Sequence, residues 1–309
     1  MTEHRSGFVA IVGRPNTGKS TLTNALVGQK VAITSSKPQT TRRVIRGMIH
    51  RPEVQIVLVD TPGIHRPRNT LGQRLNARVE QQWAEVDAIA MCLPADEEIG
   101  PGDRRIAHRL ASATKGGRRT PVIALVTKTD RISRPALATK LMSVVELGRA
   151  ASIEWAAVVP VSATAGHQLE DVIEEFTAAL PVGPALYPDG ELTDEPEIIM
   201  VAELIREAAL EGVSDELPHS IAVVVEEMGL RPDRPQNHPL LDIHANLFVE
   251  RPSQKAIVIG SKGSRLRDVG TRSRAAIEAM LGTPVYLDLR VKVAKEWQRD
   301  PKQLRRLGF

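Results

Sequence analysis

The sequence contains little cysteine and few aromatic residues. The single cysteine, Cys92, excludes an intramolecular disulfide and a zinc site built from several thiolates, and the apolar run around it indicates a buried thiol. Aromatic residues make up 3% of the chain, so stacking of nucleic-acid bases on aromatic rings is not expected. No stretch approaches the ~18 consecutive apolar residues of a membrane span. The N-terminus lacks a secretory signal pattern, so we expect a cytoplasmic protein.

The charge of the chain is unevenly distributed. The 309 residues are enough for two domains, and the net charge is only +4. Residues 255–309, however, contain 13 Lys and Arg against five Asp and Glu, which gives +8 for this segment and −4 for the rest. A basic C-terminal module is expected to meet an anion, most often nucleic acid or a membrane surface.

Apolar runs alternate with helical patterns over the first 180 residues. The runs are continuous rather than alternating, as in strands buried on both faces, so they predict a mostly parallel sheet covered by helices in an α/β domain. The expected strands are 8–12, 54–60, 86–93, 121–127 and 156–162, with 44–50 as an edge strand. The expected helices are 19–28, 70–83, 103–113, 134–149 and 168–180.

The amino-acid composition changes near residue 181. Residues 181–197 contain four prolines, two glycines and five acidic residues, which is typical of a linker. We therefore expect a first domain at 1–182, a linker at 183–196 and a second domain at 197–309. In the second domain the patterns predict a helix at 196–211, strands at 220–227 and 242–250, a helical region at 253–282 and a strand at 283–293.

The stretch "GRPNTGKST" contains the phosphate-loop pattern G-x-x-x-x-G-K-[ST]. It follows an apolar run and opens a helical pattern, as a phosphate loop must. Its backbone N–H groups would surround phosphate oxygens, Lys19 would reach the β- and γ-phosphates, and Ser20 would bind Mg²⁺. The expected nucleotide contacts are Gly13, Arg14, Pro15, Asn16, Thr17, Gly18, Lys19, Ser20 and Thr21.

Three later motifs stand at the ends of apolar runs and favour guanine. In "DTPG" (60–63), Asp60 would hold Mg²⁺ through a water and the Gly63 N–H would contact the γ-phosphate. In "TKTD" (127–130), Asp130 can accept hydrogen bonds from guanine N1–H and N2–H₂, a pattern that adenine lacks, and the Lys128 stem would stack on the base. In "SAT" (162–164), a backbone N–H would meet guanine O6. These motifs add Thr61, Pro62, Thr127, Ser162 and Ala163 to the expected contacts.

With this ordered set of motifs the chain resembles the P-loop GTPases. One departure is Thr127, which stands where the base motif usually has Asn; it keeps a hydroxyl and loses the amide, so a tether between the base loop and the phosphate loop would weaken. The polar segment "SSKPQTTRR" (35–43) is expected to be a switch loop, which needs one Thr hydroxyl on Mg²⁺. We favour Thr41 for this role, with Thr40 as the alternative.

Residue 64 is isoleucine, where many GTPases have a glutamine that orients the attacking water. Slow intrinsic hydrolysis is therefore expected, with another charge assisting the transition state. Resemblance to GTPases with "GRPN-x-GKS" implies that Asn16 helps to hold a K⁺ beside the phosphates; a residue supplied by a partner is the alternative. The expected catalytic residues are Lys19, Thr41, Gly63 and Asn16.

The second domain has a glycine-bounded loop, Gly260–Gly263, between two helical patterns. Its element order, helix–strand–strand–helix–helix–strand, matches an α+β type II KH domain, whose glycine loop clamps about four nucleotides of single-stranded RNA. Residues 257–259 line an RNA groove or belong to the core, and the basic end of the chain suits rRNA phosphates, an anionic membrane surface or plain solvent. The expected RNA contacts are Gly260, Ser261, Lys262, Gly263, Arg265 and Arg267.

The combination of "GRPNTGKST", "QTTR", "DTPGIH", "TKTD" and "SAT" with "LFVERPSQKAIVIGSKGSRL" and "VYLDLRVKV" resembles the Era family of bacterial GTPases over residues 7–300. The resemblance implies a GTP/GDP switch with Mg²⁺ whose KH domain binds the 3′ end of 16S rRNA during assembly of the small (30S) ribosomal subunit. It also implies a monomer, with peripheral association with the inner membrane in some members.

Two other readings compete with this one. A different switch GTPase, such as a tRNA-modification or 50S-assembly factor, usually joins the same loop to other domains, so the KH pattern argues against it. An RNA-binding module with a vestigial nucleotide site is the second alternative, and the intact Lys19, Ser20, Asp60 and Asp130 argue against that.

Overall fold

The structure is a computed structural model that describes residues 3–35, 37, 40–64, 69–113, 120–213, 217–235 and 237–307. Contacts divide the chain into two compact units. The first unit comprises Met1–Thr34, Thr41–Pro67 and Gly72–Asp194, and the second comprises Ser35–Thr40, Arg68–Leu71 and Glu195–Phe309.

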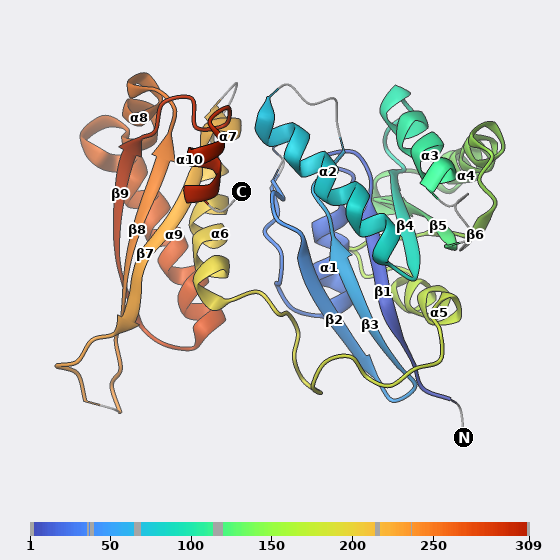
Figure 1. The fold of residues 1–309 in the computed structure, drawn as a ribbon, viewed down its shortest axis with the longest axis horizontal. Helices are drawn as coiled ribbons and strands as arrows, with labels where there is room; N and C mark the ends of the chain where they lie inside the picture. Colours follow the sequence, from blue (N-terminus) through green and yellow to red (C-terminus); the bar gives the residue numbers. More distant parts are fainter. Residues whose placement is uncertain are drawn as a thin grey trace. The chain divides into compact units, whose positions relative to one another are not determined.

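A six-stranded sheet forms the centre of the first unit (Figure 1). The strand order is β2-β3-β1-β4-β5-β6, and all neighbours are parallel except the antiparallel pair β2 and β3. The central strands β3 and β4 are buried along their whole length, which explains why their sequences are almost entirely apolar, with Gln55 and Asp60 as the polar residues of β3. The strands are β1 (Arg5–Val12), β2 (Ile45–Arg51), β3 (Val54–Asp60), β4 (Ala88–Pro94), β5 (Val122–Thr127) and β6 (Trp155–Pro160).

Helices cover both faces of this sheet. One apolar cluster joins the sheet to α2, α3 and α4 through side chains such as Trp83, Leu110 and Val144. A second cluster joins the opposite face to α1 and α5 through Leu22 and Phe176. The helices are α1 (Lys19–Val27), α2 (Thr70–Glu85), α3 (Pro101–Ala113), α4 (Arg134–Ala151) and α5 (Leu169–Ala179), with a short 3₁₀ turn η1 (Thr129–Arg131).

Strand register brings the sequence motifs to one edge of the sheet. Asp60 at the end of β3 pairs with Ile11 of β1, directly before the phosphate loop. The antiparallel strand β2 begins at Ile45 opposite the same Asp60, so the segment before β2 emerges there too. On the other side, Pro94 of β4 pairs with Thr127 of β5. The parallel strands therefore present their loops to a common site, as in open α/β sheets.

Residues 183–194, here called the anchoring segment, contact the edge strand β2 and the start of β3 and belong to the first unit. Gln55 of β3 is almost fully buried and accepts hydrogen bonds from the N–H groups of Leu186 (2.6 Å) and Tyr187 (2.9 Å). Gln55 also donates to the Tyr187 carbonyl at 2.8 Å. Further along, the Met48 N–H of β2 donates to the Leu192 carbonyl at 2.9 Å. The coil after α5 is thus attached to the first unit up to its last residues (Figure 1).

The second unit contains a three-stranded sheet in the order β7-β8-β9, antiparallel between β7 and β8 and parallel between β8 and β9. Val258, Val269 and Leu247 belong to the core between its helices and sheet. The order of elements confirms the expected α+β KH arrangement. The elements are α6 (Glu197–Leu210), α7 (Leu217–Ser220), β7 (Ala222–Leu230), β8 (Leu241–Val249), α8 (Pro252–Ile259), a 3₁₀ turn η2 (Ser261–Gly263), α9 (Ser264–Leu281), β9 (Val285–Val293) and α10 (Pro301–Arg306).

The basic C-terminal segment packs into the second unit. The side chains of Trp297, Leu304 and Leu307 are almost fully buried, and the Trp297 indole N–H donates to the Ser220 carbonyl at 2.9 Å. Asp300 caps the six-residue helix α10 by accepting from the Lys302 N–H at 2.8 Å. Within the part of the chain that the structure describes, no helix is long and apolar enough to cross a membrane.

Candidate functional site

The phosphate loop connects β1 to α1 and has the backbone shape that its sequence predicts. Asn16 and Gly18 both adopt positive φ, at 64° and 92°. The Lys19 side chain is buried beneath the loop, and its Nζ donates to the carbonyls of Arg14 (2.8 Å) and Gly13 (3.3 Å). Burial lowers the pKa of Lys19, while the nearby Asp60 charge opposes that change. An anion bound in the loop would favour the charged amine in the same way.

Three oxygen groups meet beside this lysine. The Ser20 hydroxyl donates to Asp60 Oδ2 at 2.6 Å and lies 2.7 Å from the Thr41 hydroxyl. Asp60 is fully buried, and its other oxygen, Oδ1, has no hydrogen-bond partner among the described residues. Burial raises the pKa of Asp60 to about 6, although the Ser20 hydrogen bond and the Lys19 charge both oppose this. A buried carboxylate with an unpartnered oxygen beside two hydroxyls fits the all-oxygen coordination of Mg²⁺.

The structure separates the two threonines considered for the switch. Thr41 brings its hydroxyl to Ser20, whereas the Thr40 hydroxyl donates to the Lys37 carbonyl at 2.7 Å. The Thr41 hydroxyl therefore lies within hydrogen-bond distance of Ser20, which also bonds to Asp60, whereas no bond from Thr40 to Ser20 or Asp60 is seen among the described residues. Its role on Mg²⁺ stays a prediction.

The loop after β3 lies close to the phosphate loop. A Cβ added to Gly63 would stand 2.6 Å from the Pro15 backbone nitrogen, so this approach requires glycine. The Ile64 N–H donates to the Gly13 carbonyl at 3.2 Å, and the Ile64 side chain is buried in the apolar cluster with Val12. Ile64 consequently presents neither a polar group nor an exposed surface to an attacking water.

The base loop is tied to the phosphate loop through Thr127. The buried Thr127 hydroxyl donates to the Thr17 carbonyl at 2.6 Å, so the tether exists without the amide that Asn would bring. Beyond it, Ser162 donates to Asp130 Oδ1 at 2.5 Å from a fully buried position. This hydrogen bond lowers the pKa of Asp130, which keeps the exposed carboxylate charged and oriented. Lys128 lies 3.5 Å from Asp96 and from Glu97.

Sequence motifs gave no sign of the acidic residues around the phosphate loop. Arg14 Nε donates to the buried Asp103 of α3 at 2.7 Å, and its Nη2 lies 3.0 Å from Glu97. Burial alone would lower the pKa of Arg14, but its bonds to both carboxylates raise it overall. An acidic residue in the first turn of a helix was the one available signal, and it does not name a partner 89 residues away.

In the second unit the glycine loop joins α8 to α9. Gly260 has a φ of 72°, and a Cβ there would stand 2.7 Å from the Arg265 Cβ. Lys262 also has positive φ, at 50°, and its side chain is exposed. Ile257 is 56% exposed, whereas Val258 is buried. Of residues 257–259, then, Val258 belongs to the core and Ile257 is available to a groove.

The two arginines expected to contact RNA differ in their surroundings. The Arg265 guanidinium donates to three carbonyls at the C-terminal end of α6, those of Ala209 (3.3 Å), Glu211 (2.6 Å) and Gly212 (3.3 Å). This arrangement satisfies carbonyls that the helix leaves open and complements its negative end. Arg267 is exposed and forms no ion pair among the described residues. RNA contact by either residue stays a prediction.

Together these features define a P-loop GTPase joined to a KH domain. Two family models match accordingly: one described as "50S ribosome-binding GTPase" over residues 8–128, and one described as "KH domain" over residues 216–298. The chain is 66% identical to GTPase Era of Streptomyces coelicolor, covering 100% of this chain and 96% of that protein. It is 62% identical to GTPase Era of Mycobacterium avium, covering 100% of both. The chain therefore belongs to the Era family of GTPases.

Solved structures agree with this assignment. The chain superimposes with a TM-score of 0.91 at 37% identity on Era in complex with MgGDPNP and nucleotides 1506–1542 of 16S ribosomal RNA, covering 99% of both chains. A variant of Aquifex aeolicus Era bound to GDP·AlF₄⁻ gives a TM-score of 0.90 at 36% identity, covering 98% of this chain and 99% of that chain. The expected fold class and GTPase activity are thereby confirmed, with GTP or GDP and Mg²⁺ as ligands. The family also decides against the other switch GTPases.

Proposed function

We propose that this protein is a GTP-hydrolysing switch that binds 16S rRNA near its 3′ end and assists assembly of the small (30S) ribosomal subunit. Residues 1–182 bind the nucleotide, residues 197–309 bind RNA, and residues 183–196 connect the two. The observation that carries the proposal is the presence of both sites in one chain. Ser20, Thr41 and Asp60 converge in the first unit, and the second presents a glycine loop with an exposed Lys262.

The nucleotide site supports hydrolysis with the following roles. Mg²⁺, when bound, neutralises charge on the phosphates. Ser20 and Thr41 would hold it by their hydroxyls and Asp60 through a water, while Lys19 places a buried positive charge next to the loop. The Gly63 and phosphate-loop N–H groups position the γ-phosphate. Asp130, oriented by Ser162, selects guanine.

Slow intrinsic turnover with assistance by K⁺ is part of the proposal. Because Ile64 is buried and apolar, no side chain at that position orients the water. Asn16 of the phosphate loop is exposed and has a positive φ of 64°, and its side-chain oxygen is the cation ligand that we propose. We expect hydrolysis to be about tenfold or more faster in KCl than in NaCl, and Asn16→Ala to remove most of this difference. Equal rates of the unaltered protein in both salts would overturn the K⁺ proposal and leave the GTPase assignment intact.

Coupling between the two sites tests the switch. If bound GTP raises the affinity for RNA, then bound RNA must raise the affinity for GTP by the same factor. We would titrate an RNA of nucleotides 1506–1542 of 16S rRNA into the full chain loaded with GDP or with GDPNP. An affinity ratio of about fivefold or more is expected. Lys19→Ala should lose nucleotide binding and give one RNA affinity under both conditions.

The outcomes distinguish the competing readings. RNA binding without measurable nucleotide binding by the unaltered chain would indicate a vestigial nucleotide site. Nucleotide binding with an RNA affinity that is equal in GDP and GDPNP would reject the switch. If the unaltered chain hydrolyses GTP but does not bind this RNA, the rRNA partner is rejected and the GTPase assignment stands.

Cellular context is proposed from the family resemblance and the charge pattern. We place the protein in the cytoplasm as a monomer, with peripheral association with the cytoplasmic membrane through the exposed Lys302, Arg305 and Arg306 of α10. Co-flotation with anionic but not neutral vesicles at low salt tests the membrane contact. Mass measurement by light scattering tests the monomer.

A further inference from the structure

A pocket of about 500 Å³ lies between α2 and α3 in the first unit. This volume falls within the range of ~300–1,000 Å³ common for small-molecule sites. None of the lining residues belongs to the nucleotide site described above. They are Glu80, Trp83, Arg105, His108, Arg109 and Ser112.

Trp83 gives the pocket an apolar wall and contains an unsatisfied donor. The side chain is 4% exposed, and its indole N–H has no acceptor among the described residues. The other two tryptophans differ: Trp155 donates to the Val144 carbonyl at 3.0 Å and Trp297 to the Ser220 carbonyl at 2.9 Å. This N–H is shielded from solvent, so an occupant of the pocket would contact the indole ring and not its N–H.

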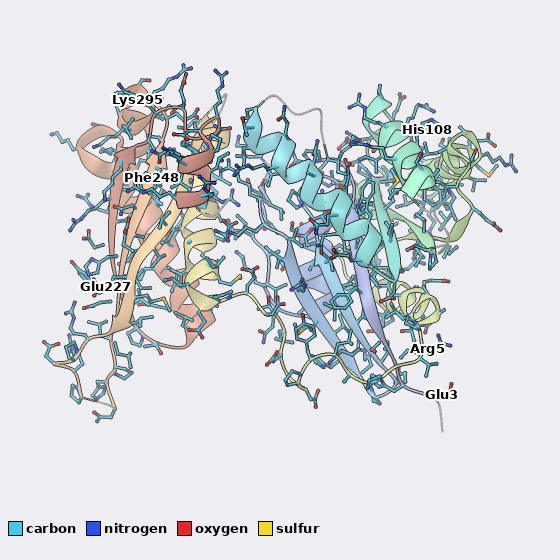
Figure 2. The ribbon with its side chains drawn as sticks, viewed as in Figure 1. Glu3, Arg5, His108, Glu227, Phe248 and Lys295 are labelled. Carbon is cyan, nitrogen blue, oxygen red and sulfur yellow. The ribbon has the colours of Figure 1, made fainter. Side chains whose placement is uncertain are left out.

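The rim of the pocket has a surplus of positive charge. Arg109 is paired with Glu80 at 2.7 Å, so these two charges balance. Arg105 and His108 form no side-chain hydrogen bond or ion pair with any described residue, and both are exposed on α3, where Figure 2 labels His108. A guanidinium beside an imidazole presents several N–H donors, which is the chemistry that recognises a carboxylate.

We propose that this pocket binds a small organic acid with a flat apolar body, which lies against Trp83 while its carboxylate meets Arg105 and His108. The size of the site argues for a small molecule, because a stable protein interface uses about 20–30 residues on each side, whereas six of the described residues line this pocket. Ligand-binding pockets typically combine an apolar lining with a few polar groups that fix orientation, as here.

Cinnamate and its neutral amide, cinnamamide, test the proposal on the full GDP-bound chain. The three indole N–H resonances in proton–nitrogen correlation spectra report the position of binding, and Trp83→Phe identifies the signal of Trp83. We expect cinnamate to shift the Trp83 signal saturably and the other two very little. Cinnamamide should bind about tenfold more weakly, since it lacks the charge.

Two neighbouring arginines on α3 provide a matched pair of variants. Arg105→Ser should weaken cinnamate binding about tenfold, whereas Arg104→Ser, one residue outside the lining, should leave it unchanged. Unaltered Trp155 and Trp297 signals show that each variant is folded. Equal binding of acid and amide, equal effects of the two substitutions, or no shift of the Trp83 signal at millimolar cinnamate would each overturn the proposal.

Discussion

Thr127 ties the base loop to the phosphate loop although it lacks the side-chain amide of the Asn that usually stands at this position. Its hydroxyl donates to the Thr17 carbonyl at 2.6 Å in a fully enclosed setting. A threonine side chain has one donor, its hydroxyl, whereas an Asn amide has two N–H donors. Asp130, the residue that we propose selects guanine, accepts a hydrogen bond from Ser162 and not from residue 127.

Thr127→Val should test this tether. Valine keeps the shape but leaves the Thr17 carbonyl without its donor, so we expect a loss of about 1–2 kcal/mol in the free energy of unfolding of the first unit. GDP affinity should fall in parallel, by about fivefold or more. Denaturant unfolding and GDP titration measure both. Thr127→Ser keeps the hydroxyl and should stay close to the unaltered protein; equal losses in the two variants would assign the effect to packing.

Ser162→Ala should raise the pKa of Asp130 toward its ordinary value, because the Ser162 hydrogen bond is the main cause of its lowering. A folded-state pKa below the unfolded value stabilises the protein above the unfolded pKa, and this contribution is lost as pH falls through the folded pKa, below about 4. The variant should lose that contribution and bind GDP about tenfold more weakly. Carbon NMR of the carboxyl group and GDP titration check this. Thr164 lowers the same pKa less than Ser162 does, so Thr164→Ala should have a clearly smaller effect and serves as the comparison. An unchanged GDP affinity in Ser162→Ala would contradict the orienting role.

At the scale of elements, α9 supplies residues to two different tasks. Arg265 faces the open end of α6 and satisfies its carbonyls, whereas Arg267, two residues on, is exposed. Both stood equal in the sequence, where they belong to the same basic turn after the glycine loop. The two arginines differ because the C-terminal end of α6 lies next to Arg265, which the sequence alone does not show.

Arg265→Ala and Arg267→Ala should therefore differ in kind. Arg265→Ala should lower the free energy of unfolding of the second unit by about 1–2 kcal/mol through loss of the helix cap. Arg267→Ala should change it by less than about 0.5 kcal/mol, but weaken RNA binding and reduce the salt slope of the RNA affinity by about 0.7, the value for one phosphate contact on a single strand. Thermal unfolding and RNA titration at several salt concentrations measure these effects. A stable Arg265→Ala variant with a reduced salt slope would instead make Arg265 an RNA contact.

Much of the element order could be predicted because it is written in local patterns. Buried parallel strands need continuous apolar runs, so β3 and β5 were found within one residue of their observed ends. The nucleotide motifs follow the ends of parallel strands, so the register of these strands places them at the same end of the sheet. Arg14 with Asp103, and Gln55 with Tyr187, could not be found in this way. These bonds join residues 89 and 132 positions apart, and a backbone carbonyl acceptor carries no residue type to recognise.

At the scale of the whole molecule, the surplus of positive charge lies toward the C-terminal end of the second unit, and most of the segment that connects the units belongs to the first. The basic surplus lies in residues 255–309, on the KH side of the chain. Five of the 37 acidic residues lie in the stretch 181–197, of which 183–194 is attached to the first unit. Arg46 of β2 pairs with Asp194 at 2.8 Å, next to the unit boundary, so the attachment extends to the last residue of the first unit.

Gln55→Ala should detach the middle of the anchoring segment. The substitution removes the acceptor of the Leu186 and Tyr187 N–H groups, so their hydrogen exchange should accelerate by about tenfold or more, while amides inside β3 stay protected. Hydrogen-exchange NMR measures this. Arg46→Gln removes the half-exposed pair with Asp194 and a side-chain interaction with Tyr187, but it leaves the bonds from Gln55 to the backbone of 186 and 187 in place, so it serves as the control. Equal exchange at residues 186 and 187 in Gln55→Ala and the unaltered chain would show that other contacts hold the segment.

The anchoring segment also changes what a protease can do with this chain. Its composition of proline, glycine and acidic residues is that of an easily cut connector, yet cleavage requires a stretch of backbone to leave the surface and enter the enzyme. Buried Gln55 and edge strand β2 oppose that departure. When opening is fast compared with cutting, the cleavage rate follows the population of the detached form. The two halves of the molecule should thus resist separation by proteolysis in proportion to the strength of the hold at Gln55.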